Sequence, residues 1–476
     1  MKLLSKLIIL VLATFFCVNV QAKDGHKIEI KIKDYDAEYC FLTGYYGNKK
    51  YVIKDTLFRT KKGLYVAEGE ESLATGLYAV LLPPKNLPFE LMISSENDQH
   101  FSIESDTTEL IKNLKIKGSE ENSAFYDYLR FRGEKNQALS ELQKQGEGEE
   151  NEKKKQKLAD KISALKDEIK QYEQDYISKH QGWLSAAMIK ASVDVKVPDS
   201  AEKMTEEEES KYRMYYYRNH YFDNLDFSDD RLLRSPVYFN KIDFFLNKLT
   251  YQVPDSLTKS VDYILEKARA NDKLYRYTVF EMVSRYGNSK VIGMDAVFVH
   301  IVENYVKGQT FDDVDEDNVA KIIKTAREFK PLLIGKKAPN ITMQTLDGED
   351  IQLYDMDADY TVLYIWDPKC GHCKKMAPKM VEFYENYKDK GVEVFAICTK
   401  DKEREQCMEF IESKNFGAFT NVLAMTNQQL YYRLKYRIKS TPIIYVLDKD
   451  KTIKMKNIGA QHLPQVMDAI MNDELN

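Results

Sequence analysis

The sequence predicts a multidomain α+β protein with a β-sandwich-like N-terminal domain, a central helical domain and a C-terminal α/β domain. Three observations predict this. Strand-like segments fill residues 26 to about 117, a helical period replaces them from about Ser119, and strands alternate with helices after Leu332. A chain of 476 residues is long enough for roughly two to four domains. We expect a signal peptide at 1–22, a β-rich domain at 23–118, a helical domain at 119–331 and the α/β domain at 332–476.

The first residues have the order of a secretory signal. Lys2 and Lys6 precede an apolar run at 7–18, and Val20 and Ala22 offer the small side chains of a cleavage site. The run is too short to span a bilayer. Cys17 raises the alternative of a lipoprotein, but the "TFFC" around it lacks the small residues of such a site. We therefore expect export to the periplasm or cell envelope without a membrane anchor.

Charge and cysteine content narrow the class of protein. Loss of Lys2 and Lys6 with the signal takes the formal charge from −5 to −7, which argues against a nucleic-acid partner. Six cysteines are few for this length, so apolar cores and not a disulfide framework stabilise the chain.

The β-rich part consists of alternating, β-branched or aromatic segments divided by turn residues. Gly47-Asn48 and Lys62-Gly63 are two of these turns. A small antiparallel sandwich is the simplest packing for such a series. The segments are "HKIEIKIKDY", "EYCFLTGYYG", "GLYAVLLPP" and "FELMIS".

The helical part begins with a predicted hairpin, because "GEGEEN" at 146–151 interrupts the pattern. Apolar residues after it alternate spacings of four and three, which is the seam of a packed helix: Leu158, Ile162, Leu165, Ile169, Tyr172 and Tyr176. Further helices are expected at 261–270 and 295–306. The stretch "YRMYYYRNHYFDNLDF" at 212–227 is either a platform for a peptide or sugar or, as we favour, aromatic core with His220 buried and hydrogen-bonded.

Residues 332–476 are predicted to form an α/β sheet that carries one chemically reactive motif. A hairpin precedes the buried strand "YTVLYIWD", and an amphipathic helix, a strand "VEVFAICTK" and a helix at about 402–414 follow. Two paired strands in "TPIIYVLDKDKTIKMKNIG" and a closing helix complete it. The motif "CGHC" at 370–373 falls between the first strand and its helix.

A Cys-x-x-Cys at this place suits redox chemistry in an oxidising compartment. The helix N-terminus stabilises a thiolate on Cys370, and Cys373 lies one turn inward, where it can close a disulfide. Trp366 is placed to pack under the motif. A zinc cage with Cys398 and Cys407 is the alternative, but eight residues separate that second pair. Cys398 and Cys407 are predicted to be either a disulfide or two buried thiols.

Residues 335–476 resemble a thioredoxin-fold domain of the exported TlpA/ResA-like class. "GKKAP", "WDPKCGHC" and "KSTPIIYVLD" match its opening, its active site and its cis-proline segment, in that order. The whole layout resembles envelope proteins of Bacteroidota. The resemblance implies a thiol–disulfide oxidoreductase that reduces or isomerises protein disulfides together with an envelope electron donor or acceptor. A non-catalytic binding protein with a thioredoxin scaffold is the alternative.

Carried over residue by residue, the resemblance makes Cys370 the attacking thiol and Cys373 the resolving thiol. Gly371 and His372 are the central dipeptide. Pro442 becomes the cis-proline, and Thr441 before it pairs with a substrate chain by strand addition.

Two acidic positions of related proteins are absent. Tyr364 stands six residues before Cys370 and Met376 six after it, so Asp367, Lys374 or a water are the candidates that accept the proton of Cys373. No threonine stands where peroxidase chemistry needs one. No phosphate loop, HExxH or GxSxG occurs either, and we expect no metal and no cofactor.

The central Gly-His predicts an intermediate reduction potential. A histidine near the helix N-terminus can donate a hydrogen bond or positive charge to the Cys370 thiolate, and this favours the reduced form. Protein disulfide isomerase shares the dipeptide and lies about 90 mV above thioredoxin, roughly 4 kcal/mol for two electrons.

Overall fold

The computed structural model describes residues 25–94, 99–200, 203–400, 403–427 and 429–474. It divides into two compact units between residues 245 and 246, within one helix. The predicted signal peptide lies outside the described residues. None of the helices in the described ranges combines the length and apolar character that crossing a bilayer requires. The multidomain α+β class is confirmed, with β-sheets first, helices next and an α/β domain last.

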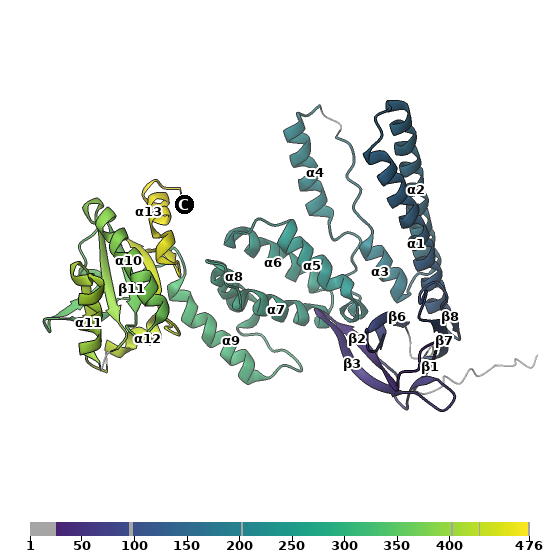
Figure 1. The fold of residues 1–476 in the computed structure, drawn as a ribbon, viewed down its shortest axis with the longest axis horizontal. Coiled ribbons are helices and arrows are strands. Elements are labelled where there is room, and N and C mark those ends of the chain that lie inside the picture. The colour runs from purple at the N-terminus through teal and green to yellow at the C-terminus, as the bar shows by residue number, and fades with distance from the viewer. Residues whose placement is uncertain (1–24, 95–98, 201–202, 401–402, 428, 475–476) are drawn as a thin grey trace, which may run out of the picture. The chain divides into compact units, whose positions relative to one another are not determined.

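The first unit opens with two four-stranded sheets (Figure 1). Their strand orders are β4-β1-β7-β8 and β3-β2-β5-β6. Residues that alternate along β1 are buried, as a strand with one covered face requires. The strands are β1 His26–Lys33, β2 Tyr39–Tyr46, β3 Lys49–Phe58, β4 Tyr65–Gly69, β5 Gly76–Leu82, β6 Leu87–Ile93, β7 His100–Asp106 and β8 Lys115–Lys117.

One strand pair departs from the antiparallel arrangement that the sequence predicts. β1 and β7 run parallel, with Ile28 opposite Phe101 and Ile30 opposite Ile103. The other pairs in both sheets are antiparallel. The whole second sheet lies between β1 and β7 in the chain, and a connection of that length can return in either direction.

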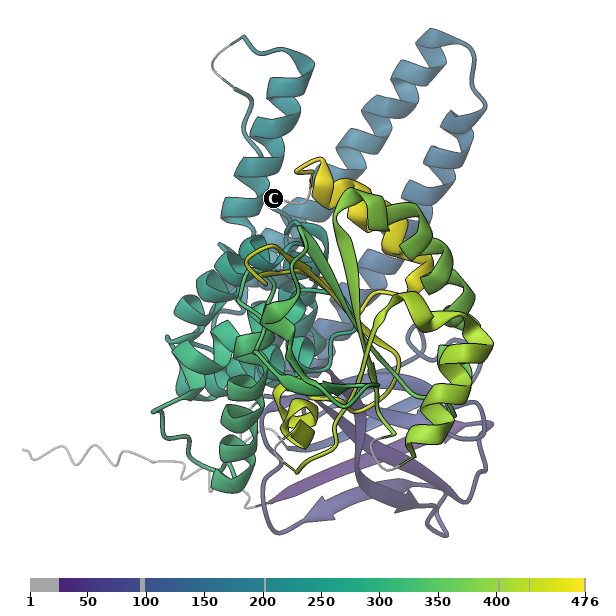
Figure 2. The same ribbon diagram turned by 90° about the vertical axis from the view of Figure 1, so that its left-hand side faces the viewer.

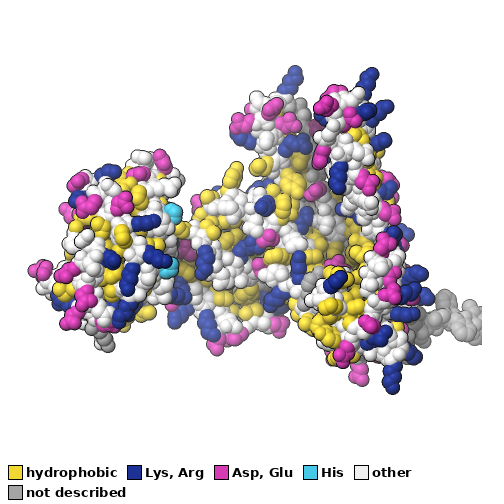
Figure 3. All heavy atoms as spheres, in the orientation of Figure 1, with side chains coloured by type: hydrophobic (Ala, Val, Ile, Leu, Met, Phe, Trp, Pro, Cys, Tyr) yellow, Lys and Arg dark blue, Asp and Glu magenta, His cyan; other side chains and the backbone are white. Residues whose placement is uncertain are grey.

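The predicted helical hairpin is formed by α1 (Glu120–Glu147) and α2 (Glu152–Lys179). Phe131 of α1 stacks on Tyr172 of α2 with ring centroids 3.9 Å apart. Ile169 and Tyr176 of the predicted seam are buried, whereas its first residues are half-exposed because the hairpin tip has few neighbours. Lys, Arg, Asp and Glu side chains follow the visible face of the hairpin (Figure 3), which fits a solvated surface.

The aromatic stretch at 212–227 is core only in its second half. Tyr221, Phe222 and Phe227 are buried, while Met214 and Tyr215 at the middle of α4 are exposed. The prediction that His220 is buried was wrong. Its ring lies at the helix end, 41% exposed, and its Nδ1 is 2.6 Å from a carboxylate oxygen of Asp223.

Further helices complete the first unit and open the second. They are α3 Leu184–Ser192, α4 Glu206–His220, α5 Pro236–Lys248, α6 Pro254–Ala268, α7 Asp272–Gly287, α8 Met294–Ile301 with a π-helical turn Val302–Val306, and α9 Glu316–Phe329. Helices occur where the sequence predicts them at 261–270 and 295–306.

The C-terminal part is one seven-stranded sheet of order β10-β9-β13-β12-β11-β14-β15, with helices along it (Figure 2). Alternate residues of β11 enter two different cores. Tyr364 and Trp366 face the core that holds Cys373, and Leu363 and Ile365 face the other. The elements are β9 Thr342–Thr345, β10 Asp350–Gln352, β11 Tyr360–Trp366, α10 Gly371–Tyr387, β12 Val392–Cys398, α11 Arg404–Lys414, β13 Thr420–Leu423, α12 Tyr432–Lys435, β14 Ile443–Asp448, β15 Ile453–Lys456 and α13 Leu463–Met471.

Two ionic contacts join the helices of the second unit to this sheet, and we call them the clamp. The buried Lys456 ammonium binds the Asp295 carboxylate of α8 and the Leu332 carbonyl. Arg437 Nε lies 3.1 Å from a carboxylate oxygen of Glu328 on α9. The clamp therefore fixes α8 and α9 against the end of the sheet that carries residues 437–443 and 456.

Candidate active site

The strand β11 ends at Trp366 and the helix α10 begins at Gly371, so Cys370 is the N-cap residue of α10. Its Sγ accepts a hydrogen bond from the backbone N–H of Cys373 at 3.4 Å. The Sγ also lies 3.2 Å from the carbonyl oxygen of Thr441. The first cysteine is thus held where unpaired N–H groups of the first helical turn point.

The environment of Cys370 favours its thiolate. Burial opposes ionisation, yet hydrogen bonds donated to the sulfur by the Thr441 hydroxyl and the Cys373 backbone N–H bring the pKa of the Cys370 thiol below its usual value. The backbone N–H of His372 contributes in the same direction. Because the side chain is only half-buried, the sulfur is both ionisable and within reach of a partner.

Cys373 has the opposite environment. Its side chain is fully buried, and this burial raises the pKa of the Cys373 thiol to about 12. The backbone N–H of Asp367 points at its Sγ across 3.5 Å. Both are free thiols, but they differ in reactivity, because the pKa of Cys370 is lowered and that of Cys373 is raised.

The predicted supporting residues surround this pair. The Thr441–Pro442 peptide bond is cis, and Thr441 is the residue whose carbonyl approaches Cys370. Trp366 is fully buried and stacks on Phe410 with ring centroids 4.7 Å apart, so it packs in the core behind the motif.

The central dipeptide is almost free of packing. A Cβ atom on Gly371 would meet no heavy atom within 4 Å. The His372 ring is exposed, and it forms no hydrogen bond or ion pair with the described part of the chain. In the structure His372 therefore acts on Cys370 through its backbone N–H.

The two positions that carry acids in related proteins are apolar or nearly so. Tyr364 is fully buried, and burial raises the pKa of its phenol far above its usual value. Met376 packs against the same core. Of the three candidate proton acceptors, Lys374 is exposed, whereas Asp367 is next to Cys373 through its backbone.

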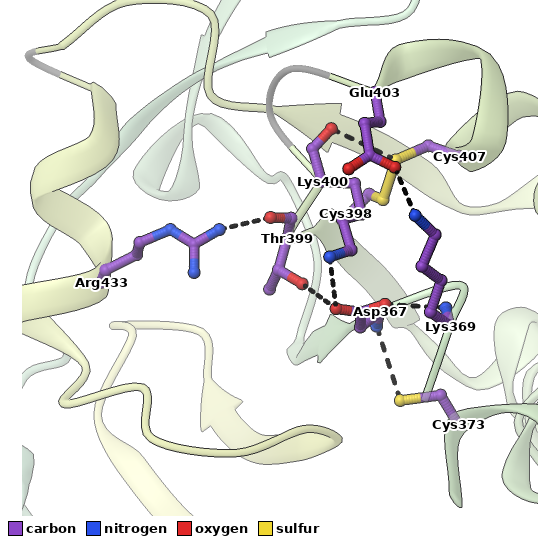
Figure 4. The surroundings of a disulfide bond; sticks show 9 residues. All are labelled: Asp367, Lys369, Cys373, Cys398, Thr399, Lys400, Glu403, Cys407 and Arg433. Carbon is purple, nitrogen blue, oxygen red and sulfur yellow. Dashed lines mark hydrogen bonds and ion pairs between the residues drawn. A yellow bond between two sulfur atoms is a disulfide. The ribbon is translucent and has the colours of Figure 1, made fainter. Parts of the chain in front are cut away.

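Cys398 and Cys407 form a disulfide, which decides between the two states that the sequence left open. It joins the end of β12 to α11 immediately beside the candidate site (Figure 4), since Cys398 is the register partner of Trp366. This bond uses the two sulfur atoms that the zinc alternative needs. Within the described ranges, no three His, Cys, Asp or Glu side chains come together as metal ligands.

The sequence did not predict the polar network around Asp367. The hydroxyl of Thr399 donates to a carboxylate oxygen of Asp367 at 3.4 Å, and Lys400 Nζ lies 3.6 Å from the same oxygen. Beyond them, Lys369 pairs with Glu403 at 2.8 Å (Figure 4). The network forms because β11 and β12 pair in parallel register, which brings the residues after Trp366 next to those after Cys398. Prediction of this register would have been needed to find the network.

A strand-to-helix dithiol beside a cis-proline, on a sheet of this order, defines a thiol–disulfide oxidoreductase of the thioredoxin fold. Residues 334–456 match the AhpC/TSA family, and residues 143–328 match a domain of unknown function, DUF5106. A thiol-disulfide oxidoreductase ResA of Bacillus cereus is 31% identical over 135 residues, which are 28% of this chain and 74% of the relative. The chain therefore belongs to the TlpA/ResA-like family of thiol–disulfide oxidoreductases.

Other relatives are similar over the same part. ResA of Bacillus subtilis is 35% identical over 122 residues, 25% of this chain and 65% of the relative. Among solved structures, a domain of a possible thiol-disulfide isomerase from Cytophaga hutchinsonii is 38% identical and covers 30% of this chain and 96% of its own, with a TM-score of 0.29. A thioredoxin-like protein from Bacteroides caccae is 19% identical. The match covers 58% of this chain and 98% of that protein, with a TM-score of 0.44.

Proposed function

We propose that the protein reduces or isomerises disulfides of exported proteins, with Cys370 as nucleophile and Cys373 as resolving thiol. The observation that carries this assignment is the difference between their environments. Cys370 is half-exposed with a lowered pKa, and Cys373 is buried with a pKa raised to about 12. Only a thiolate attacks a disulfide, so the first step belongs to Cys370.

The reaction proceeds in two exchanges. The Cys370 thiolate attacks one sulfur of the substrate disulfide, forms a mixed disulfide and releases the other substrate sulfur as a thiolate. Cys373 then loses its proton and attacks the Cys370 sulfur, so that the Cys370–Cys373 bond closes and the second substrate thiolate leaves. Two electrons pass from the dithiol to the substrate, and an envelope dithiol donor returns them. If another thiolate of the substrate attacks the mixed disulfide before Cys373 does, a rearranged substrate disulfide forms and the Cys370 thiolate leaves, so that the substrate is isomerised without net electron transfer.

The cis-proline segment orients the substrate. Thr441 lies beside Cys370, so a substrate backbone that pairs with Thr441 places its disulfide against the Cys370 sulfur. Recognition of this kind uses main-chain hydrogen bonds and is largely independent of side chains.

Asp367 is the proton acceptor for Cys373 in this proposal. It is adjacent to the buried sulfur through its backbone N–H, and its carboxylate lies beside Lys400 and Thr399. A base is needed there because the thiol of Cys373 does not ionise by itself near neutral pH. Asp367→Asn should slow closure of the disulfide while the first attack, measured as a burst of released substrate thiol, stays fast. Slowing of both steps alike would contradict this role.

The test of the two thiol roles uses single serine variants of the full chain. Cys370→Ser should abolish reduction of a protein disulfide, because the nucleophile is lost. Cys373→Ser should accumulate mixed disulfides, because attack continues and resolution does not. If both variants were inert and neither trapped a partner, the assignment would be wrong. Mass spectrometry of the trapped species would also identify the substrates.

We also propose export to the periplasm or cell envelope, with the mature chain divided at 118 and 331. The order of basic, apolar and small residues at 1–22 supports export. The native protein should begin at Lys23, and a mature chain that starts at a lipidated Cys17 would overturn this. The two matched regions end at 328 and begin at 334, so residues 329–333 lie outside both, which supports the second boundary.

A further inference from the structure

A cleft of about 570 Å³ lies in the second unit, between the turn that joins α7 to α8 and the segment before β14. On the helical side, residues 287–293 line it, and Lys290, Val291 and Ile292 are exposed there. On the other side it is lined by Arg437, Lys439 and Ile443, among others. The clamp holds these two walls together.

The cleft carries an excess of positive charge. Its lining includes Lys290, Arg437, Lys439 and Lys456, against the single carboxylate of Asp295. Lys456 and Arg437 are occupied by the clamp. Lys290 and Lys439 are exposed and form no ion pair with any residue that the structure describes. The ammonium groups of Lys290 and Lys439 are therefore available to bind anionic groups of another molecule.

The cleft lies beside the chain segment that carries Thr441, although Cys370, Thr441 and Pro442 are not among its lining residues. Lys439 and Ile443 flank Thr441 by two residues on either side, and an extended chain advances about 3.3–3.6 Å per residue. The lining thus comes within about 7 Å of the Thr441 backbone, measured along the chain. Since the Thr441 carbonyl is 3.2 Å from the Cys370 sulfur, a substrate strand paired at Thr441 passes close to Lys439 and Ile443 of the lining.

We infer that this cleft binds an acidic segment of the substrate protein next to its disulfide, with Lys290 and Lys439 as the residues that select it. The inference rests on the proposed disulfide exchange at Cys370. It gives the helices that precede the redox domain a part in substrate selection, because Lys290 belongs to them. Strand pairing at Thr441 is blind to side chains, so charge in the adjoining cleft is what can distinguish one substrate from another.

The experiment compares two disulfide-linked peptide dimers that differ only in Asp against Asn at positions flanking the cysteine. Stopped-flow measurement of their reduction by the dithiol form of the full chain gives a second-order rate constant for each. The wild type should reduce the Asp dimer about two- to tenfold faster, as expected for two exposed ion pairs and electrostatic steering. High salt should remove the difference.

Charge reversal provides the decisive variants. Lys290→Glu with Lys439→Glu should invert the preference, so that the Asn dimer reacts faster. Lys449→Glu, directly after β14 and outside the cleft lining, is the matched control and should keep the preference of the wild type. Equal rates for the two dimers in the wild type, or the same preference in the double variant, would overturn the inference.

An uncharged disulfide separates this inference from the proposed function. Bis(2-hydroxyethyl) disulfide has no acidic group, so all variants should reduce it at the wild-type rate. If the wild type failed to reduce it, the proposed exchange at Cys370 would be wrong. If it were reduced normally while the peptide preference was missing, only the role of the cleft would be wrong.

Discussion

Replacement of His372 by proline should make the dithiol more reducing, for a reason that the structure specifies. The backbone N–H of His372 stabilises the Cys370 thiolate, and proline has no N–H to donate. The helix itself tolerates the change, because the N–H groups of its first turn have no partner within the helix. Loss of the hydrogen bond destabilises the reduced form and leaves the disulfide unchanged, so the potential falls.

The size of the shift follows from the energy of a charge-assisted hydrogen bond. Such a bond contributes about 1.5–3 kcal/mol. Because 1.4 kcal/mol corresponds to about 30 mV for two electrons, roughly 30–65 mV is the upper bound of the shift toward a more negative potential. The variant should shift by less, because the His372 N–H makes the smallest of the contributions that lower the pKa of Cys370. His372→Ala is the matched control. It keeps the backbone N–H and removes only a ring that has no described partner, so we expect a shift below about 10 mV.

The assay equilibrates the full chain in glutathione buffers and quantifies the Cys370 and Cys373 thiols by alkylation and peptide mass spectrometry. Because each peptide is quantified separately, the cysteines of the Cys398–Cys407 disulfide do not contribute to the measured thiol content. An alanine variant that shifts as far as the proline variant would show that the ring tunes the pair. Two unchanged potentials would show that His372 does not tune it at all.

Three further predictions concern ionisation and stability. The rate of disulfide reduction should rise with pH through the pKa of Cys370, because the thiolate is the nucleophile and a fall in pH protonates it. The inflection should lie below the ordinary thiol value of 9.0, and an inflection in stopped-flow rates above 9.0 would contradict the lowered pKa. Asp295→Ala leaves the buried Lys456 ammonium unpaired and should lower the free energy of unfolding by about 3–5 kcal/mol in urea titrations. A second substitution in the same chain, Lys456→Met, should restore most of this stability. A double variant as unstable as the single variant would refute the pairing. Serine at both Cys398 and Cys407 opens a loop with a sequence separation of 9 and should remove about 2–3 kcal/mol by the chain-entropy model, whereas an unchanged urea midpoint would show that the bond adds no stability.

The sequence predicted the elements whose signals are local. The buried strand before the dithiol and the helix after it follow from periodicity, and both are present as β11 and α10. The strand β13 was missed, because its four residues "TNVL" are too short to show a period. Its place depends on partners far apart in the chain, with β12 on one side and β9 on the other.

For the candidate site, sequence reasoning found the residues of the motif and missed those that packing brings to it. Cys370 and Cys373 stand in one recognisable pattern. The contact of Thr399 with Asp367 depends on strand register, and the pairing of Cys398 with Cys407 depends on a distance that no sequence pattern encodes. The burial of Cys373, which separates the two thiols chemically, follows from the three-dimensional core alone.

The empty surroundings of Gly371 and His372 have a consequence for how this protein can evolve. Most residues near a reactive centre are constrained twice, once by chemistry and once by packing. Here a side chain added at Gly371 would meet open space and the His372 ring is exposed, so both positions can be exchanged without disturbing the core. A substitution that removes a backbone N–H at these positions, such as proline, can move the electron affinity of the dithiol while the folded domain keeps its stability. The same scaffold can in this way be adapted to a more reducing habitat by a single substitution.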